Sequence, residues 1–458
     1  MYLRYQNKRI LHIRGEQVFS DRELKNMIVP LFLEQLLVML VGLADTLVVS
    51  FVSEAAVSGV SLVNSFNTIF IYLFTALASG GAVVISQYIG HRERETAGQT
   101  ASQLLMVSTL FSLVMGLLVL WGNETLMGLM FGRVEREVMD ACVTYLRISA
   151  YSYPAIAVYN AGAALYRSFG RTITTMYISI LSNGINVVGN LIGVSVLKAG
   201  VAGVAWPSLI ARTFSAAAIT ALCFSRQNPV SYEAKWIFHW DGALLGRMLR
   251  IAVPNGFESG IFQLVKVALS SVVALFGTYQ IAANGIAQSI WSMASLVCVA
   301  MGPVFITVIG QCMGAGNVPQ AELCFHRLMK ITLRFSIAWN GLIFAATPVL
   351  MRFYAVAPET KALVIRLVLL HNIFSAIAFP FADPLGKGLR ATGDIRFTTA
   401  VSVFTTVGVR LLLSLLFSLV LDMGVLGIAW AMCADWAIRG VIFLLRFQSE
   451  KWEAFQVI

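Results

Sequence analysis

The sequence predicts an all-α polytopic membrane protein, with twelve transmembrane helices in two pseudo-symmetric six-helix bundles. Three observations support this prediction. Of the 458 residues, 58% are hydrophobic and only 12% are charged, against roughly 25% charged residues in soluble domains. Long stretches of the chain carry no charge, and the two halves of the chain repeat one another. Lipid must be the solvent of such a chain, so we exclude a soluble enzyme, a disordered chain and a disulfide-rich scaffold.

The uncharged stretches define the predicted helices. No Asp, Glu, Lys or Arg occurs in residues 55–90, 96–123, 172–197 or 267–321, and the last stretch is long enough for two spans of about 20 residues each. These segments must be helical, because lipid offers no partner to free backbone N–H and C=O groups. The short alternating segments of a membrane β-barrel are absent. The predicted spans are 27–52, 57–89, 98–121, 141–164, 174–197, 202–224, 248–276, 282–313, 325–348, 366–386, 397–420 and 425–446.

The basic residues orient the helices, because cytoplasmic loops carry an excess of Lys and Arg. With both termini in the cytoplasm, the cytoplasmic segments and helix ends hold 21 of the 33 basic residues, and the external loops hold 6. We therefore expect a protein of the cytoplasmic (inner) membrane, and the net charge of +10 reflects its topology rather than nucleic-acid binding. The predicted divisions are a basic N-terminal segment (1–26), an N-lobe (27–224), a cytoplasmic linker (225–247), a C-lobe (248–446) and a cytoplasmic C-terminal tail (447–458).

An internal repeat relates the two halves at an offset of 224 residues (254 − 30). Because each half has six spans, both copies have the same orientation in the membrane. This arrangement is typical of transporters built from two parallel bundles. The equivalent pairs are Pro30 with Pro254, Glu34 with Glu258, residues 200–206 with residues 424–430 and, shifted by one position, Arg167 with Arg390.

Acidic residues inside the first predicted helix are candidates for ion coupling. An ionised carboxylate at mid-bilayer costs roughly 2.5–3.5 kcal/mol on insertion scales, so such residues usually face a bundle interior or an aqueous cavity. Glu34 and Asp45 are eleven residues apart, which places them on one face of the helix. We expect Asp45 to be protonated and deprotonated during transport. The alternatives are an outer-interface residue for Asp45 and a buried hydrogen-bonded group for Glu34.

Three ionisable residues of the second half form a second candidate site. Glu258 and Lys266 share one face of the seventh helix but are too far apart for direct contact. Lys266 therefore needs an acid from another helix, and Asp383 on the tenth helix is the candidate. In this hypothesis Glu258 stays free for a proton, a sodium ion or a cationic substrate. The alternative is a static ion pair that fixes the bundle.

A third group of charged residues lies in the last helix. Asp435 and Arg439 are four residues apart, the spacing of a local ion pair, and we assign this pair a structural role. Arg212 and Arg410 also lie in spans, and either could pair with Asp435.

Neutral polar residues complete the site around Asp45. Asn186 and Asn190 are four residues apart and face one way, and a side-chain amide supplies both a donor and an acceptor. Such groups could hold a cation or a protonated carboxyl beside Asp45, and the alternative is hydrogen bonding between helices. The predicted ion-coupling and substrate-cleft residues are Asp45, Glu34, Asn160, Asn186, Asn190, Ser208, Glu258, Gln263, Lys266 and Asp383.

The sequence contains no motif for covalent or metal chemistry. It has no Walker P-loop, GxSxG or HExxH motif, and its six Cys and five His residues are dispersed. We therefore expect no enzyme activity, no cofactor and no metal site. The energy for transport must then come from a gradient, and the expected coupling ion is H⁺ or Na⁺.

These residues together resemble the multidrug and toxic compound extrusion (MATE) transporters, over nearly the whole chain beyond its first 25 or so residues. Their order and spacing carry the resemblance more than any single motif. The matching pieces are Pro30, Asp45-Thr46, Gln87–Gly90, Tyr159-Asn160, Arg167–Gly170, Asn186, Asn190, Gly203–Ser208, Pro254, Glu258, Ile281–Asn284, Gly310–Gly316 and Gly388–Asp394.

The resemblance implies two six-helix lobes around a central cleft and export driven by inward proton or sodium flow. In many members a first-helix aspartate couples to the ion, and Asp45 stands at that place. Asn186 and Ser208 match two of its usual partners, whereas Asn190 stands where an aspartate is usual. Glu258 resembles the seventh-helix carboxylate that serves in other members.

We therefore expect a monomeric, cation-coupled antiporter in membrane lipid. It would export amphipathic, cationic organic compounds or drugs by alternating access and would bind no nucleic acid. The alternative function is a flippase for a lipid-linked oligosaccharide or another lipid-like substrate, which would favour a more basic cavity. A membrane enzyme would need clustered catalytic residues, and a passive channel would not need two bundles that both contain acids.

Overall fold

The computed structural model describes residues 19–132, 134–353, 356–455 and 457–458, and every regular element in these ranges is helical. Within these ranges, ten helices are long and apolar enough to cross a membrane. The α5–α6 pair and α8 add two further segments, which gives twelve and confirms the predicted fold class. Four basic residues of the predicted N-terminal cytoplasmic segment lie outside the described residues, namely Arg4, Lys8, Arg9 and Arg14.

The helices of the first half follow the predicted spans with one interruption. The predicted fourth span divides at Ser152, two residues before Pro154, which has no N–H to donate to a continuous helix. The helices are α2 (Asp21–Ser50), α3 (Glu54–Gly90), α4 (Arg94–Phe131), α5 (Arg136–Tyr151), α6 (Tyr153–Ser168), α7 (Thr172–Leu191), the π-helix η1 (Ile192–Val196), α8 (Ala202–Cys223) and α9 (Ala234–Ile237).

The second half is more often interrupted. Pro380 and Pro384 divide the predicted tenth span into α14, α15 and α16. The helices are α10 (Gly242–Val273), η2 (Ala274–Phe276), α11 (Thr278–Ala294), α12 (Leu296–Gly314), α13 (Val318–Phe353), α14 (Pro358–Ile377), α15 (Phe379–Ala382), α16 (Pro384–Thr392), α17 (Ile395–Phe404), the π-helix η3 (Thr405–Leu411), α18 (Leu412–Leu415), the π-helix η4 (Leu416–Val420), α19 (Val425–Gln448) and η5 (Lys451–Ala454).

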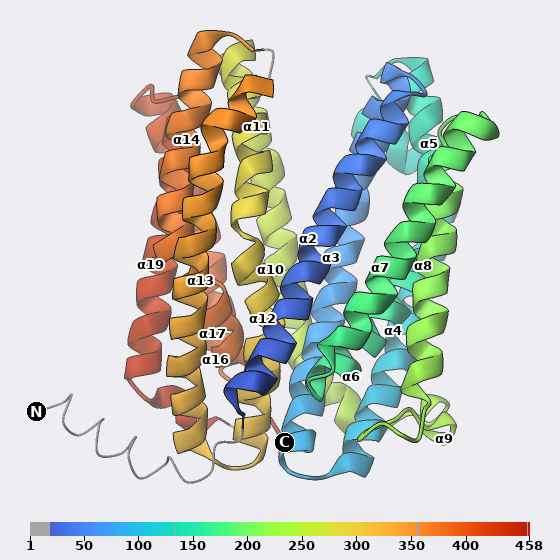
Figure 1. Ribbon diagram of the computed structural model, residues 1–458, viewed down its shortest axis with the longest axis vertical. Coiled ribbons are helices and arrows are strands. Elements are labelled where there is room, and N and C mark those ends of the chain that lie inside the picture. Colours follow the sequence, from blue (N-terminus) through green and yellow to red (C-terminus); the bar gives the residue numbers. More distant parts are fainter. Residues whose placement is uncertain (1–18, 133, 354–355, 456) are drawn as a thin grey trace, which may run out of the picture. The chain divides into compact units, whose positions relative to one another are not determined.

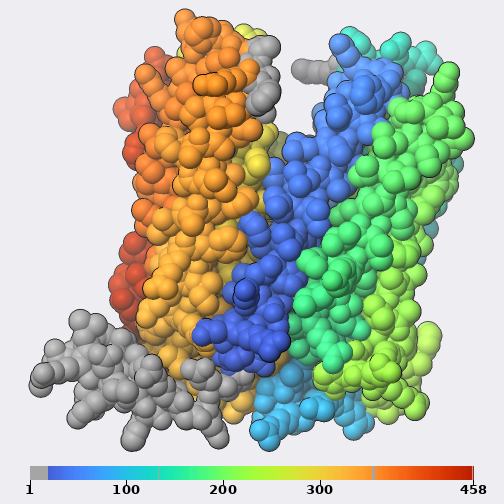
Figure 2. Space-filling view, in the orientation of Figure 1, coloured from blue at the N-terminus to red at the C-terminus, as the bar shows by residue number. Residues whose placement is uncertain are grey.

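The chain forms two compact units, each with its own hydrophobic core. The N-unit comprises Val29–Ile89 and Glu93–Gly256, and the C-unit comprises Met1–Ile28, Gly90–Arg92 and Phe257–Ile458. In the N-unit, α7 packs against α8, and α8 packs against α5 and α6. Figure 1 shows α2 in blue and α7 and α8 in green running lengthwise beside one another, and Figure 2 shows their side chains covering one face of the N-unit.

In the C-unit, α19 packs against α14, α15 and the π-helical segments η3 and η4. The helix α12 packs against α13 and α16, and α11 packs against α14. The two compact units divide inside α10, between Gly256 and Phe257. The lobe and linker boundaries predicted from the sequence stay a prediction.

The internal repeat extends to local backbone geometry. The π-helices η1 and η4 occupy equivalent positions in the two copies, since Ile192–Val196 and Leu416–Val420 are related by the offset of 224. Each π-helix lies against a glycine of the following helix. A Cβ on Gly203 would lie 2.6 Å from the Gly193 carbonyl oxygen, and a Cβ on Gly427 would lie 2.6 Å from the carbonyl carbon of Phe417. The recurring glycines therefore permit the same close helix contact in each copy.

Candidate ion-coupling and substrate site

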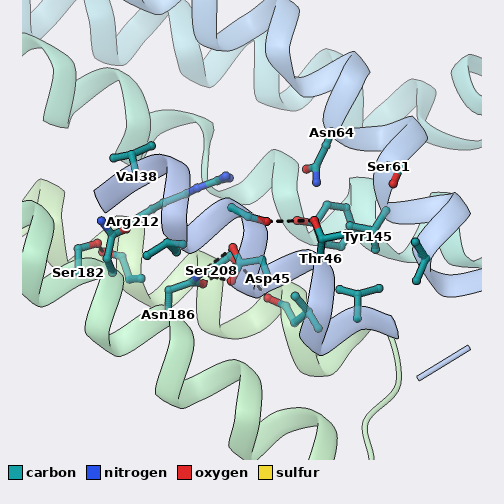
Figure 3. Close-up of a pocket in the computed structure, with 18 residues that line it drawn as sticks. Val38, Asp45, Thr46, Ser61, Asn64, Tyr145, Ser182, Asn186, Ser208 and Arg212 are labelled. Atoms are coloured by element: carbon teal, nitrogen blue, oxygen red, sulfur yellow. Dashed lines mark hydrogen bonds between the residues drawn. The ribbon is translucent and has the colours of Figure 1, made fainter. Parts of the chain in front are cut away.

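Asp45 lies half-buried on α2 and accepts hydrogen bonds from two amides on α7. The Nδ2 atom of Asn186 lies 2.9 Å from both carboxylate oxygens, and Nδ2 of Asn190 lies 2.7 Å from Oδ1. The hydroxyl of Ser208 on α8 donates to Oδ1 of Asn186 at 2.8 Å. Figure 3 shows Asp45, Asn186 and Ser208 side by side. The structure thus brings Asp45 together with the three neutral residues predicted beside it, Asn186, Asn190 and Ser208.

Close packing of α7 on α8 positions this network. Asn186 and Asn190 are one helical turn apart, so both amides face α2. Between them, Gly189 lies against Pro207, and a Cβ on Gly189 would fall 2.6 Å from the Pro207 Cβ. The absent side chain lets α8 approach α7, which brings Ser208 within hydrogen-bond distance of Asn186.

A cavity of about 340 Å³ adjoins Asp45 in the N-unit. Valine side chains form much of its apolar wall, and hydroxyl, amide and charged groups face it from α2, α3, α5, α7 and α8 (Figure 3). Its volume lies at the lower end of the range of small-molecule sites, about 300–1,000 Å³. Its polar lining residues are Asp45, Thr46, Ser61, Asn64, Tyr145, Ser182, Asn183, Asn186, Ser208 and Arg212.

Glu34 lies in a separate ion pair of the N-unit. Its Oε1 lies 2.8 Å from Nη2 of Arg167 and 3.3 Å from the Tyr159 hydroxyl. Its Oε2 accepts a hydrogen bond from the Thr175 hydroxyl at 3.1 Å. Glu34 is therefore fully engaged with α6 and α7 and does not line the Asp45 cavity. This geometry matches the alternative of a buried, hydrogen-bonded group.

Glu258 forms the equivalent ion pair in the C-unit, with Arg390. The Arg390 guanidinium also lies 3.3 Å from the hydroxyls of Thr398 and Ser402. Our prediction that Glu258 stays free of a basic partner was wrong. The reason is the repeat itself, because Arg390 is the counterpart of Arg167 and reaches the acid in the same way.

The predicted pairing of Lys266 with Asp383 was also wrong. Asp383 pairs with Lys387 at 2.8 Å, because residues four apart on a helix lie side by side. Lys266 is exposed and forms no ion pair with any carboxylate of the described residues. The predicted cluster of Glu258, Lys266 and Asp383 is thus replaced by two separate ion pairs.

Asp435 has two basic neighbours. Nη2 of Arg439 lies 2.8 Å from Oδ1, the contact predicted from their spacing, and Nη1 of Arg410 lies 3.9 Å from Oδ2. Of the two arginines that we considered as a further partner of Asp435, Arg410 is therefore the one that lies near it. Arg212 instead donates from Nη1 to the Ser152 hydroxyl at 2.7 Å.

Two other predicted site residues contribute no polar contact. The side chains of Asn160 and Gln263 are half-buried and form no hydrogen bond with the part of the chain that the structure describes. Asn160 also does not line the Asp45 cavity.

The electrostatic setting separates Asp45 from the other acids that we placed in spans. Glu34, Glu258, Asp383 and Asp435 each have an Arg or Lys within ion-pair distance. Asp45 has neutral amide donors instead, and it forms no ion pair with a described basic residue. Among these five acids, Asp45 is the one that no described basic side chain contacts within ion-pair distance.

Sequence reasoning overlooked the basic partners of these acids. Arg167 and Arg390 recur together with Glu34 and Glu258, so the repeat already indicated that the two acids and the two arginines form equivalent pairs. Lys387 was placed just outside a span, although its four-residue distance from Asp383 was a usable signal.

Comparison with known proteins identifies the family. The MatE family model matches residues 30–192 and, a second time, residues 254–416. The chain belongs to the MatE family. The two matches begin 224 residues apart (254 − 30), the same offset as the internal repeat. Members of this family are transporters, and the family is one of multidrug efflux.

The MatE relatives match over nearly their full length. The chain is 28% identical to the uncharacterized transporter YisQ of Bacillus subtilis, over 92% of this chain and 93% of that protein. It is 23% identical to the probable multidrug resistance protein NorM of Thermotoga maritima, over 95% of this chain and 94% of the relative. The multidrug resistance protein PmpM of Pseudomonas aeruginosa is also 23% identical, over 87% and 84%.

Solved MATE structures share the fold. A multidrug resistance MATE family transporter of the MOP superfamily, in an outward-facing conformation, superimposes with a TM-score of 0.87 at 20% identity, covering 93% of this chain and 95% of that chain. A MATE protein in a bent conformation gives a TM-score of 0.86 at 20% identity and covers 97% of both chains. The chain is thus a multi-pass membrane protein with the MATE fold.

Proposed function

We propose that this protein is a proton-coupled antiporter of the cytoplasmic membrane that exports small amphipathic organic compounds. Both termini lie in the cytoplasm in this proposal, and the excess of basic residues in the cytoplasmic segments supports that orientation. The Asp45 carboxylate carries the proton, and the adjoining cavity holds the substrate. Alternating access of the cavity to the two sides of the membrane completes the cycle, as in other transporters built from repeats.

One observation supports Asp45 as the proton carrier. It is the acid whose partners are neutral, whereas the other four acids that we placed in spans are paired with Arg or Lys. A paired carboxylate is stabilised in its charged form, because a nearby positive charge disfavours protonation. A carboxylate held by amides can exchange a proton without breaking a direct ion pair.

The Asn190 amide can serve both protonation states of Asp45. Its Nδ2 donates to the ionised carboxylate, and its Oδ1 is buried without a hydrogen-bond partner among the described residues. A protonated carboxyl is itself a donor and needs an acceptor. Rotation of the amide by half a turn would present Oδ1 to that donor, so one side chain accommodates both states.

The same contacts favour a proton over sodium. A sodium ion, like other hard cations, prefers several oxygen ligands. Here N–H groups of Asn186 and Asn190 face the carboxylate, and the Ser208 hydroxyl is already bonded to Asn186. These donors stabilise the ionised carboxylate directly, whereas a sodium ion would require both amides to turn their oxygens toward it.

The sensitivity to each ion is tested in proteoliposomes that contain the purified protein, with proton and sodium gradients imposed separately. We expect a proton gradient alone to drive substrate accumulation, and Asp45→Asn to abolish it in a folded protein. Glu258→Gln serves as the matched control, because its carboxylate is also in a span but is paired with Arg390. Accumulation driven only by sodium, or unchanged proton-driven accumulation in Asp45→Asn, would overturn the proposal.

A further inference from the structure

Arg212 is a positive charge in the wall of the Asp45 cavity that ion coupling does not use. It lies on α8, one helical turn after Ser208, so both side chains face the same way. The cavity is lined by Asp45 and Arg212 together (Figure 3). A charged residue at membrane depth is costly and usually faces a functional cavity.

The protein itself leaves the Arg212 charge without a direct counter-ion. Within the described residues, its guanidinium forms no ion pair, and its hydrogen bond goes to the neutral Ser152 hydroxyl at 2.7 Å. One such bond uses only one of the five N–H donors of a guanidinium. By contrast, Arg167, Arg390 and Arg439 each contact a carboxylate of the protein. The remaining donors of Arg212 are available to a ligand in the cavity.

We propose that Arg212 is a specificity residue that binds the anionic group of zwitterionic, amphipathic substrates. The substrate carboxylate, or a similar planar anion, pairs with the Arg212 guanidinium, whose fork of donors matches such groups. The substrate ammonium lies toward Asp45, and its apolar body lies against the valines of the wall. This assignment rests on the proposed function and names the substrate class of that same cavity.

The direction of coupling agrees with a zwitterion better than with a simple anion. With Asp45 ionised, the cavity contains one negative and one positive side chain, which match the two charges of a zwitterion. Protonation of Asp45 removes the partner of the ammonium and weakens binding, as exchange of a proton for substrate requires. A simple anion would instead bind more tightly after protonation, because the cavity then has a net positive charge.

The test measures binding of two matched dyes to the purified protein in detergent, by fluorescence polarisation. One is a zwitterionic rhodamine with a free benzoate, and the other is the cationic methyl ester of the same dye. We expect the wild-type protein to bind the free acid about tenfold more tightly than the ester, and Arg212→Gln to remove this preference by weakening only the acid. Arg212→Lys retains the charge and should keep part of the preference.

Two control variants separate recognition from structure. Ser152→Ala removes the hydrogen bond of Arg212 at the break between α5 and α6 but keeps the cavity charge, so dye preference should persist. Arg226→Gln removes one positive charge from an exposed position outside the cavity and should change neither affinity. Equal affinities of the wild-type protein for the two dyes, or an equal loss of both dyes in Arg212→Gln, would overturn the inference.

The outcome is also distinguishable from failure of the proposed function. The binding measurement needs no ion gradient, so it tests Arg212 alone. Proton-driven efflux of the ester by a protein with no preference for the acid would leave the antiporter proposal intact and refute the role of Arg212. Preferential binding of the acid without proton-driven transport of either dye would do the reverse.

Discussion

Removal of the Glu34 carboxylate should destabilise the N-unit strongly. The side chain is only 5% exposed, and it accepts bonds from Arg167 at 2.8 Å, Thr175 at 3.1 Å and Tyr159 at 3.3 Å. Glu34→Ala removes the buried carboxylate that pairs with the half-buried Arg167 guanidinium. Breaking a buried ion pair in this way typically costs about 3–5 kcal/mol of unfolding free energy.

The repeat supplies a matched comparison in Glu258→Ala. The Glu258 side chain is 18% exposed, and its partner Arg390 retains the hydroxyls of Thr398 and Ser402. We therefore expect a smaller cost, about 1–3 kcal/mol, since the remaining donors keep polar partners. We therefore rank Glu34→Ala as the more destabilising of the two variants.

The assay uses the cysteines of the protein as reporters of unfolding. All six are free and buried, so a fluorogenic maleimide reacts with them only as the fold opens. For Glu34→Ala we expect a fall in Tm of roughly 10 °C, since 1 kcal/mol shifts the Tm of a unit of this size by about 2–4 °C. A wild-type Tm for Glu34→Ala, or a larger loss for Glu258→Ala, would refute the reasoning.

Three further outcomes are expected. Gly203→Val should prevent correct packing of α8 and abolish the monodisperse peak in size-exclusion chromatography, whereas Gly184→Val, which faces open space, should not; equal behaviour of the two would contradict the close-contact argument. Asp435→Asn should lower the unfolding free energy by about 3 kcal/mol, measured with the same maleimide, because it removes the one negative charge that Arg410 and Arg439 share in a buried site. In a cysteine-free background, a cysteine at Lys235 should resist an impermeant thiol reagent in intact cells and one at Glu359 should react, and labelling of both would sink the proposed topology.

The sequence predicted the membrane-spanning helices and the face that Asn186 and Asn190 share, but not the breaks within the helices. Long apolar stretches leave a membrane chain no alternative to helices, and the four-residue spacing of Asn186 and Asn190 already placed both amides on one face. The contacts between distant charges were harder to predict. Glu34 and Arg167 are 133 residues apart, and their meeting depends on how α2 packs against α6, which helical periodicity does not determine. The functional roles of these residues stay predictions.

The repeat contained more information than we extracted from it. The offset of 224 that aligns Glu34 with Glu258 also aligns Asp45 with Leu269 and Asn186 with Arg410. The second copy therefore has no carboxylate at the position of Asp45 and has a positive charge at that of Asn186. This comparison would have argued against a second coupling site built around Glu258.

A single coupling carboxylate also determines how the membrane potential acts on transport. If one proton enters for each monovalent cation that leaves, the exchange moves no net charge, and the membrane potential does no work. If one proton enters for each zwitterion, one positive charge moves inward in every cycle. Each 100 mV of potential then supplies about 2.3 kcal/mol, which corresponds to a roughly 50-fold concentration ratio of exported substrate. The charge type of the substrate, read by the cavity, would thus decide whether the protein uses the electrical part of the proton gradient.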